Sequence, residues 1–149
     1  MNLLDTILGR ENQAPEKLTS AEAFAAIALV AVTSDDLLSE QQVRNISSVL
    51  SRLKLFSSYS EDFIENLLEK NLNILRHDGF NALFNAAKES LSPELREVAF
   101  AVAADLVMTE SIVTEEEKNF LTDLYQSLDI PRDSAIKILQ VLMVKNQSL

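Results

Sequence analysis

The stretch AFAAIALVAVTSDDLLSEQQ, residues 23–42, decides the fold. Its first half, Ala23–Val32, is apolar on every face of a helix, and such a helix has to be buried inside a domain. Its second half is an acidic turn that leads to Ser39, whose hydroxyl can accept a hydrogen bond from a free backbone N–H at a helix start. The stretch therefore predicts a buried central helix, a turn and a second helix.

The same arrangement recurs 75 residues later, in the stretch VAFAVAADLVMTESIVTEEE, residues 98–117. Thr114 stands where Ser39 stands in the first copy, and Glu117 follows it at the spacing of a capping box, as Gln42 follows Ser39. In a capping box each of the two side chains accepts a hydrogen bond from a backbone N–H that the helix start leaves free. Both stretches therefore predict an apolar helix, an acidic turn and a capped helix.

The match between the two copies continues along the helices that follow. Apolar residues correspond at the same offset, with Ile46, Val49, Leu53, Leu55 and Leu67 matching Leu121, Leu124, Leu128, Ile130 and Leu142. We therefore expect an internal pseudo-two-fold repeat, with halves at about residues 19–78 and 92–149. The two apolar helices, Ala21–Val32 and Pro93–Met108, should lie side by side. Two arrangements stay open, because the acidic turns would then lie either near one another or at opposite ends.

The chain as a whole is expected to be all-α, a compact bundle of about seven to eight helices. It contains two glycines and three prolines, and its longer apolar segments follow helical spacing. Residues 1–18 should form a short helix, Asn2–Leu8, and a linker, and residues 19–149 a single domain. Locally, we expect a loop at Lys54–Ser58 and a helix end at Asp78-Gly79, with Gly79 left-handed. Phe63 and Val98 should lie in the core. The tail, residues 146–149, should fray.

Composition excludes several classes of protein. There is no cysteine, so disulfides, thiolate metal sites and thiol redox chemistry are excluded. The net charge of −10 argues against nucleic acid, whose phosphates require clustered Lys and Arg, and against anionic membrane surfaces. Ala23–Val32 is too short to span a bilayer, and Met1–Asp5 lacks the basic region of a signal peptide. We therefore expect a cytoplasmic protein without membrane insertion.

Carboxylates at the two turns are the candidate ligands for a cation. Asp35, Asp36 and Glu110 could supply oxygens to a hard cation such as Ca²⁺, which takes six to eight of them. The alternative is that they are turn residues that bond nearby backbone amides. Asp105 interrupts the apolar run of a helix that should be buried, so its carboxylate must be paired, protonated or a further ligand. Glu117 is explained by its capping box alone, although it also lies at the second turn.

Catalytic signatures are missing from the sequence, and we expect no enzyme. His77 is the one histidine, and its place near a helix end suits a cationic cap. No glycine-rich phosphate loop, nucleophile elbow or histidine-based metal motif occurs. Three acidic residues share one face of a helix, as is usual for a solvated surface: Asp62, Glu65 and Glu69.

The repeated turn resembles the TerB family, the TerB-like domain associated with tellurite resistance. That family is all-helical and contains a repeated motif. In each copy an apolar helix is followed by Asp-Gly, then by two residues of which the second is aliphatic, then by a helix-capping residue. A Glu stands seven positions after the Asp. The corresponding stretches here are Asp35–Gln42 and Glu110–Glu117. They depart from the pattern at four positions, with Asp36 and Ser111 replacing the glycines, Gln42 replacing the Glu and Glu110 replacing the Asp. The resemblance implies divalent metal binding through acidic residues and a role in stress responses.

Two functions are therefore expected from the sequence. The first is a TerB-like module of the tellurite or metal-stress response that binds a divalent cation, Ca²⁺, Mg²⁺ or Zn²⁺, through Asp35, Asp36, Asp105, Glu110 and Glu117. The second is a metal-free interaction domain, with no cofactor, whose acidic surface meets a basic protein partner. A homodimer is a further expectation, because the apolar side of Asn2–Leu8 could cover a neighbouring copy.

Overall fold

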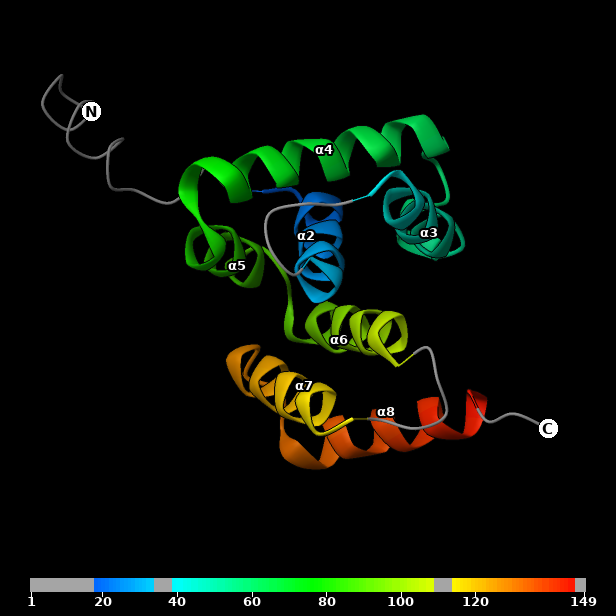
Figure 1. Ribbon diagram of the computed structural model, residues 1–149, viewed down its shortest axis with the longest axis vertical. Helices are drawn as coiled ribbons and strands as arrows, with labels where there is room; N and C mark the ends of the chain where they lie inside the picture. The colour runs from blue at the N-terminus through cyan, green and yellow to red at the C-terminus, as the bar shows by residue number, and fades with distance from the viewer. Residues whose placement is uncertain (1–17, 34–38, 109–113, 147–149) are drawn as a thin grey trace, which may run out of the picture.

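The computed structural model describes residues 18–33, 39–108 and 114–146, and in these residues the protein is all-α, without strands (Figure 1). A short 3₁₀ helix, Lys54–Phe56, follows the second of the α-helices. The α-helices are α2 (Ser20–Val32), α3 (Glu40–Ser51), α4 (Glu61–Asp78), α5 (Phe80–Glu89), α6 (Pro93–Val107), α7 (Glu115–Ser127) and α8 (Arg132–Lys145). The all-α prediction is confirmed.

Helix α2 is the centre of the fold. Every residue from Ala21 to Val30 is buried. Helices α4, α5 and α6 pack around α2, and α3 also contacts it, as Figure 1 shows. A helix without a polar face can be stable only when neighbours cover all of its sides. The prediction of a buried central helix is therefore confirmed.

Helix α6 lies alongside α2 and joins the two parts of the molecule. On its other side it carries α7 and α8, which lie at the opposite end of the molecule from α4 (Figure 1). The expected side-by-side packing of the two apolar helices is confirmed. The expectation of complete burial is wrong for α6, because Val98 is 44 % exposed and the fully buried residues are Ala99, Phe100, Ala103 and Ala104.

Helix starts follow the local signals in the sequence. Complete capping boxes are present at Thr19, Ser39 and Thr114, and Ser92 caps α6 ahead of its first-turn proline. Helices α3 and α7, which follow the two acidic turns, begin 75 residues apart, at Glu40 and Glu115. These starts agree with the offset found in the sequence. The pseudo-two-fold repeat of the whole fold stays a prediction.

Two local predictions are wrong, each for a packing reason, and a third is confirmed. The expected loop contains the 3₁₀ helix Lys54–Phe56, because Phe56 is fully buried and its ring lies 5.9 Å edge-on from Phe24. Phe63 is 45 % exposed, with its ring 4.8 Å from Tyr59 instead of in the core. The predicted helix end at Asp78-Gly79 is confirmed, and Gly79 has a positive φ of 91° with ψ 169°, because this one residue both ends α4 and begins α5. That conformation is essentially restricted to glycine.

An ion pair between the buried carboxylate of Glu22 and the half-exposed side chain of Lys70 fastens the start of α2 to α4. Glu22 is 8 % exposed, and its carboxylate binds the ammonium group of Lys70 at 2.5 Å. The neighbouring Asn71 donates a hydrogen bond of 3.0 Å to the backbone carbonyl of Glu22. The sequence identified Glu22 only as the partner of Thr19 in a capping box, and that box is also present. Glu22 therefore has both a local and a long-range structural role.

The environment of Glu22 lowers its pKa below the ordinary value of 4.5. Burial opposes ionisation and would raise the pKa. The hydrogen bonds from Lys70 and the Thr19 backbone, with the positive charge of Lys70, together outweigh burial. A carboxylate with a lowered pKa in the folded protein stabilises the fold above its unfolded pKa, and this contribution is lost as the pH falls through the folded pKa.

We expect Glu22→Gln to destabilise the protein at neutral pH by about 1–2 kcal/mol, because glutamine keeps the cap but leaves Lys70 without its anion. The difference from the native protein should shrink as the pH falls through the lowered pKa of the folded Glu22 carboxyl, where the native side chain is itself protonated. Urea unfolding of both proteins at neutral and at acidic pH measures it.

Glu117→Gln is the matched control, because Glu117 occupies the same position in an exposed capping box. This substitution should change the free energy of unfolding by no more than about 0.5 kcal/mol. An equal loss for Glu22→Gln at neutral and acidic pH would contradict the assignment of the stabilisation to the charged pair.

Candidate functional site

The candidate site is at the two acidic turns. Three of its proposed ligands lie outside the described residues: Asp35, Asp36 and Glu110. The structure does describe what borders each turn. Helix α2 ends at Val32 and is followed by Thr33, whose hydroxyl donates to a carbonyl of the last turn of α2. On the other borders lie Ser39, Met108 and Thr114.

Two of these four residues, Thr33 and Thr114, line one hollow of about 470 Å³ together with Val107, the last residue of α6. Its walls are the end of α2, the end of α6 and the first turns of α7. The lining residues are Val30, Ala31, Val32, Thr33, Val107, Thr114, Glu116, Glu117 and Phe120. The end of α2, which leads into the first turn, therefore meets the end of α6 and the start of α7, which flank the second turn. This placement favours the first of the two arrangements left open by the sequence.

Glu117 is engaged in the cap of α7. Its Oε1 accepts a hydrogen bond of 3.0 Å from the backbone N–H of Thr114, and the Thr114 hydroxyl accepts one of 3.1 Å from the N–H of Glu117. Glu115 and Glu116 share the same first turn, where the helix dipole favours negative charge. The hollow thus has an acidic rim at the start of α7, and the role of Glu117 that the structure supports is capping.

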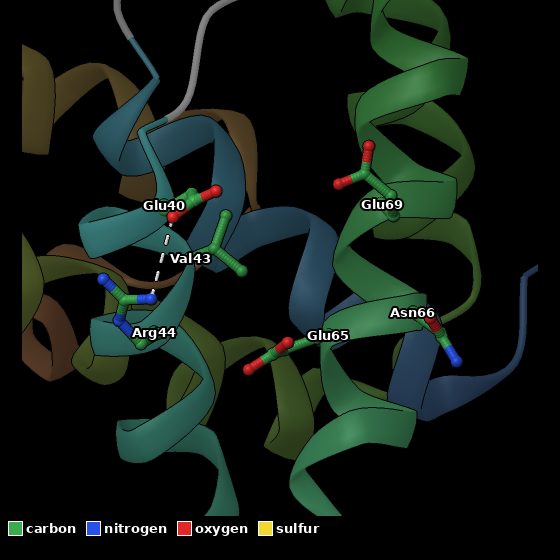
Figure 2. A pocket seen from close by; sticks show the side chains of 6 residues that line it. All are labelled: Glu40, Val43, Arg44, Glu65, Asn66 and Glu69. Atoms are coloured by element: carbon green, nitrogen blue, oxygen red, sulfur yellow. Dashed lines mark ion pairs between the residues drawn. The ribbon is translucent and has the colours of Figure 1, made fainter.

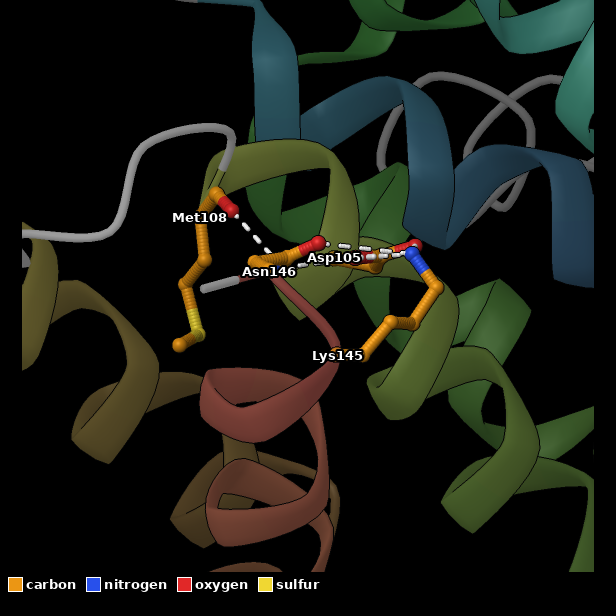
Figure 3. A network of polar contacts seen from close by, with 4 residues as sticks. All are labelled: Asp105, Met108, Lys145 and Asn146. Atoms are coloured by element: carbon orange, nitrogen blue, oxygen red, sulfur yellow. Dashed lines mark hydrogen bonds and ion pairs between the residues drawn. The ribbon is translucent and has the colours of Figure 1, made fainter. Parts of the chain in front are cut away.

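Asp105 is held in a network between α6 and the end of α8 (Figure 3). Its carboxylate accepts hydrogen bonds from the Lys145 ammonium at 3.2 and 3.3 Å and from the Asn146 amide at 3.0 Å. The same amide group donates to the backbone carbonyl of Met108, which lies just past the end of α6, at 3.0 Å. The partly buried carboxylate is therefore paired and hydrogen-bonded, as a carboxylate in that position requires.

This network holds the end of α6 in place, just before the second acidic turn. The side chain of Asn146 ties the carbonyl of Met108 to Asp105, so the chain leaves α6 from a fastened position. The expectation that the tail frays from residue 146 is wrong for Asn146, whose side chain has these partners. Sequence reasoning missed Lys145 and Asn146, because nothing in their local pattern links them to a residue some forty positions earlier.

A metal centre is not formed within residues 18–33, 39–108 and 114–146, where no group of three or more His, Cys, Asp or Glu side chains is placed to hold an ion. Asp105 and Glu117, the two candidate ligands in these ranges, each have a protein partner. The cation hypothesis therefore depends on Asp35, Asp36 and Glu110.

A second acidic feature, the acidic groove, lies between α3 and α4 and has a volume of about 420 Å³ (Figure 2). Its lining residues are Glu40, Val43, Arg44, Glu65, Asn66 and Glu69. Arg44 is drawn toward Glu40 on its own helix, at 3.9 Å. In Figure 2 the carboxylate of Glu65 extends from α4 toward α3. The acidic face noted in the sequence is thus one wall of a groove.

No family model matches the chain, and no curated protein or solved structure matches it. The resemblance to the TerB family stays a prediction. None of the described helices is long and apolar enough to cross a membrane.

Proposed function

We propose that this protein is a cytoplasmic TerB-like binding module that holds a divalent cation between its two acidic turns and acts in the response to metal stress. The observation that supports the proposal most directly is the hollow shared by the end of α2, the end of α6 and the start of α7. Each of these elements leads into or out of one of the turns.

A hard cation requires more oxygen ligands than one of these turns could supply, since Ca²⁺ takes six to eight. Two turns that meet would combine Asp35 and Asp36 with Glu110, and backbone carbonyls and water would complete the shell. The net charge of −10 raises the local concentration of cations around the molecule. The function is therefore proposed as binding of an ion by both turns together.

Cation binding should raise the melting temperature, because the ion binds the folded chain. At a concentration ten times the Kd, the added stability is about 1.4 kcal/mol, which corresponds to about 3–6 °C for a domain of this size. Thermal unfolding with millimolar Ca²⁺, Mg²⁺, Mn²⁺ or Zn²⁺ measures it, and the double variant Asp35→Ala/Glu110→Ala should lose the shift.

The matched control is Glu89→Ala/Asp133→Ala, which removes two exposed carboxylates far from the turns in sequence. It should keep the full shift. The proposal fails if none of the four ions raises the melting temperature, or if both double variants respond as the native protein does.

A second candidate function is recognition of a basic protein segment, supported by the acidic groove between α3 and α4. Its lining includes the aliphatic side chain of Val43 and three glutamates, Glu40, Glu65 and Glu69. A groove between two helices with an acidic lining is suited to an amphipathic basic helix, whose apolar side enters the groove while its lysines meet the carboxylates.

A lysine-rich amphipathic peptide tests this second function by calorimetric titration. Glu65→Gln/Glu69→Gln should weaken binding roughly threefold to tenfold, because each partly exposed charge pair contributes about 0.2–1 kcal/mol. Glu94→Gln/Glu97→Gln, on α6, is the control of equal charge and should bind as the native protein does. Affinity that is equal in both double variants, or that disappears with a chelator, would speak against this groove.

A further inference from the structure

A groove lined by aromatic side chains lies between α5 and α7, and we call it the aromatic groove. Its volume is about 510 Å³, and its lining residues are Phe80, Asn81, Phe84, Asn85 and Lys88 from α5 and Phe120, Asp123, Leu124 and Ser127 from α7. The rings of Phe80 and Phe84 are stacked with centroids 5.8 Å apart. Phe80 is 48 % exposed, so its ring presents apolar surface to solvent at this groove, beside the buried Phe84 and Leu124.

The lining residues are arranged as in a site that accepts a helix. On each wall the apolar pair is spaced by four residues, Phe80 with Phe84 and Phe120 with Leu124. Polar residues border these pairs, and among them Lys88 is held by Asp129 at 2.9 Å. An apolar channel with a polar rim is the usual receptor for the apolar side of an amphipathic helix. The groove is therefore suited to a short amphipathic helix with an apolar side.

The chain itself carries a segment of that chemistry. Residues 2–8 have Leu3, Leu4, Ile7 and Leu8 at the spacing of one helix face, with Asp5 away from it. A helix of this length is marginal in water by itself, so it needs a surface that covers its apolar side chains. The four aliphatic side chains match a groove that offers four apolar ones.

The position of the start of α2 places the aromatic groove within reach of that segment. The first turn of α2 is fastened to α4 by Glu22 and Lys70, and α5, one wall of the groove, follows α4 directly through Gly79. Residues 9–17 could span up to about 30 Å when extended. A second apolar hollow, between α7 and α8, is less suitable, because α8 lies at the opposite end of the molecule from α4 (Figure 1).

We propose that residues 2–8 dock as a short helix in the aromatic groove of the same molecule, with their aliphatic side chains against Phe80, Phe84 and Phe120. Docking covers the exposed ring of Phe80 and joins the N-terminus of the chain to α5 and α7. This contact does not rest on either proposed function, although Phe120 lines both the aromatic groove and the hollow at the end of α2.

Paramagnetic relaxation measures the contact directly, because the chain has no cysteine of its own. A nitroxide attached to Asn2→Cys lies on the polar side of the expected helix. In the ¹⁵N-labelled full chain it should cause loss of amide signal at Asn81, Asn85 and Asp123, and no comparable loss at Val141 and Val144 on α8.

Three substitutions in the spin-labelled chain separate docking from general proximity. Phe80→Ser should restore the signals at the rim, whereas Phe63→Ser, which alters a phenylalanine of similar exposure on α4, should leave the loss unchanged. Ile7→Asp should also restore the signals, because it places a charge on the apolar side of the segment. Loss of signal that is the same in all three variants would overturn the proposal.

A mixture of spin-labelled ¹⁴N chain with unlabelled ¹⁵N chain identifies which molecule provides the segment. Docking within one molecule predicts no loss at the rim in this mixture. Loss in the mixture as strong as in the single chain would mean that a second copy occupies the groove, and an absence of loss at the rim in the single chain would mean that residues 2–8 do not occupy it. Either result would overturn the proposal.

Discussion

The burial of α2 is the constraint on which the rest of the structure depends. Residues Ala21–Val30 are all buried, so neighbouring helices must cover this helix on every side. Helices α4, α5 and α6 provide most of that cover. The polar exception, Glu22, is at the first turn, where Lys70 neutralises it and Asn71 binds its carbonyl. Apolar packing and the ion pair of the buried Glu22 carboxylate with Lys70 thus hold α2 against α4.

The packing of α2 on α6 also determines where the two acidic turns begin. Because the two helices lie side by side, the end of α2 and the end of α6 line the same hollow together with the start of α7. The network of Asp105, Lys145 and Asn146 then fastens the end of α6 to α8. The core therefore brings the borders of the turns together, and the proposed cation site uses a geometry that the hydrophobic core already requires.

Local features could be predicted from the sequence, and long-range polar contacts could not. The capping boxes at Thr19, Ser39 and Thr114 fixed the helix starts, because the partners in each box are three residues apart. The pairs Glu22–Lys70 and Asp105–Lys145 join residues 48 and 40 positions apart, and no spacing rule connects them. Burial of Phe56 and exposure of Phe63 likewise depend on how helices pack, which periodicity alone does not specify. For the same reason the sequence identified the acidic turns but left their relative placement open.

Native-state hydrogen exchange tests most directly whether the fold depends on α2. If the fold depends on α2 as the helix that α3, α4, α5 and α6 cover, its amides from Ala25 to Leu29 should exchange only when the whole domain unfolds. Their exchange free energy should then equal the free energy of unfolding from urea titration, while amides of α8 exchange through smaller openings. The account would be contradicted if the α2 amides exchanged through a local opening at a lower free energy than those of α8.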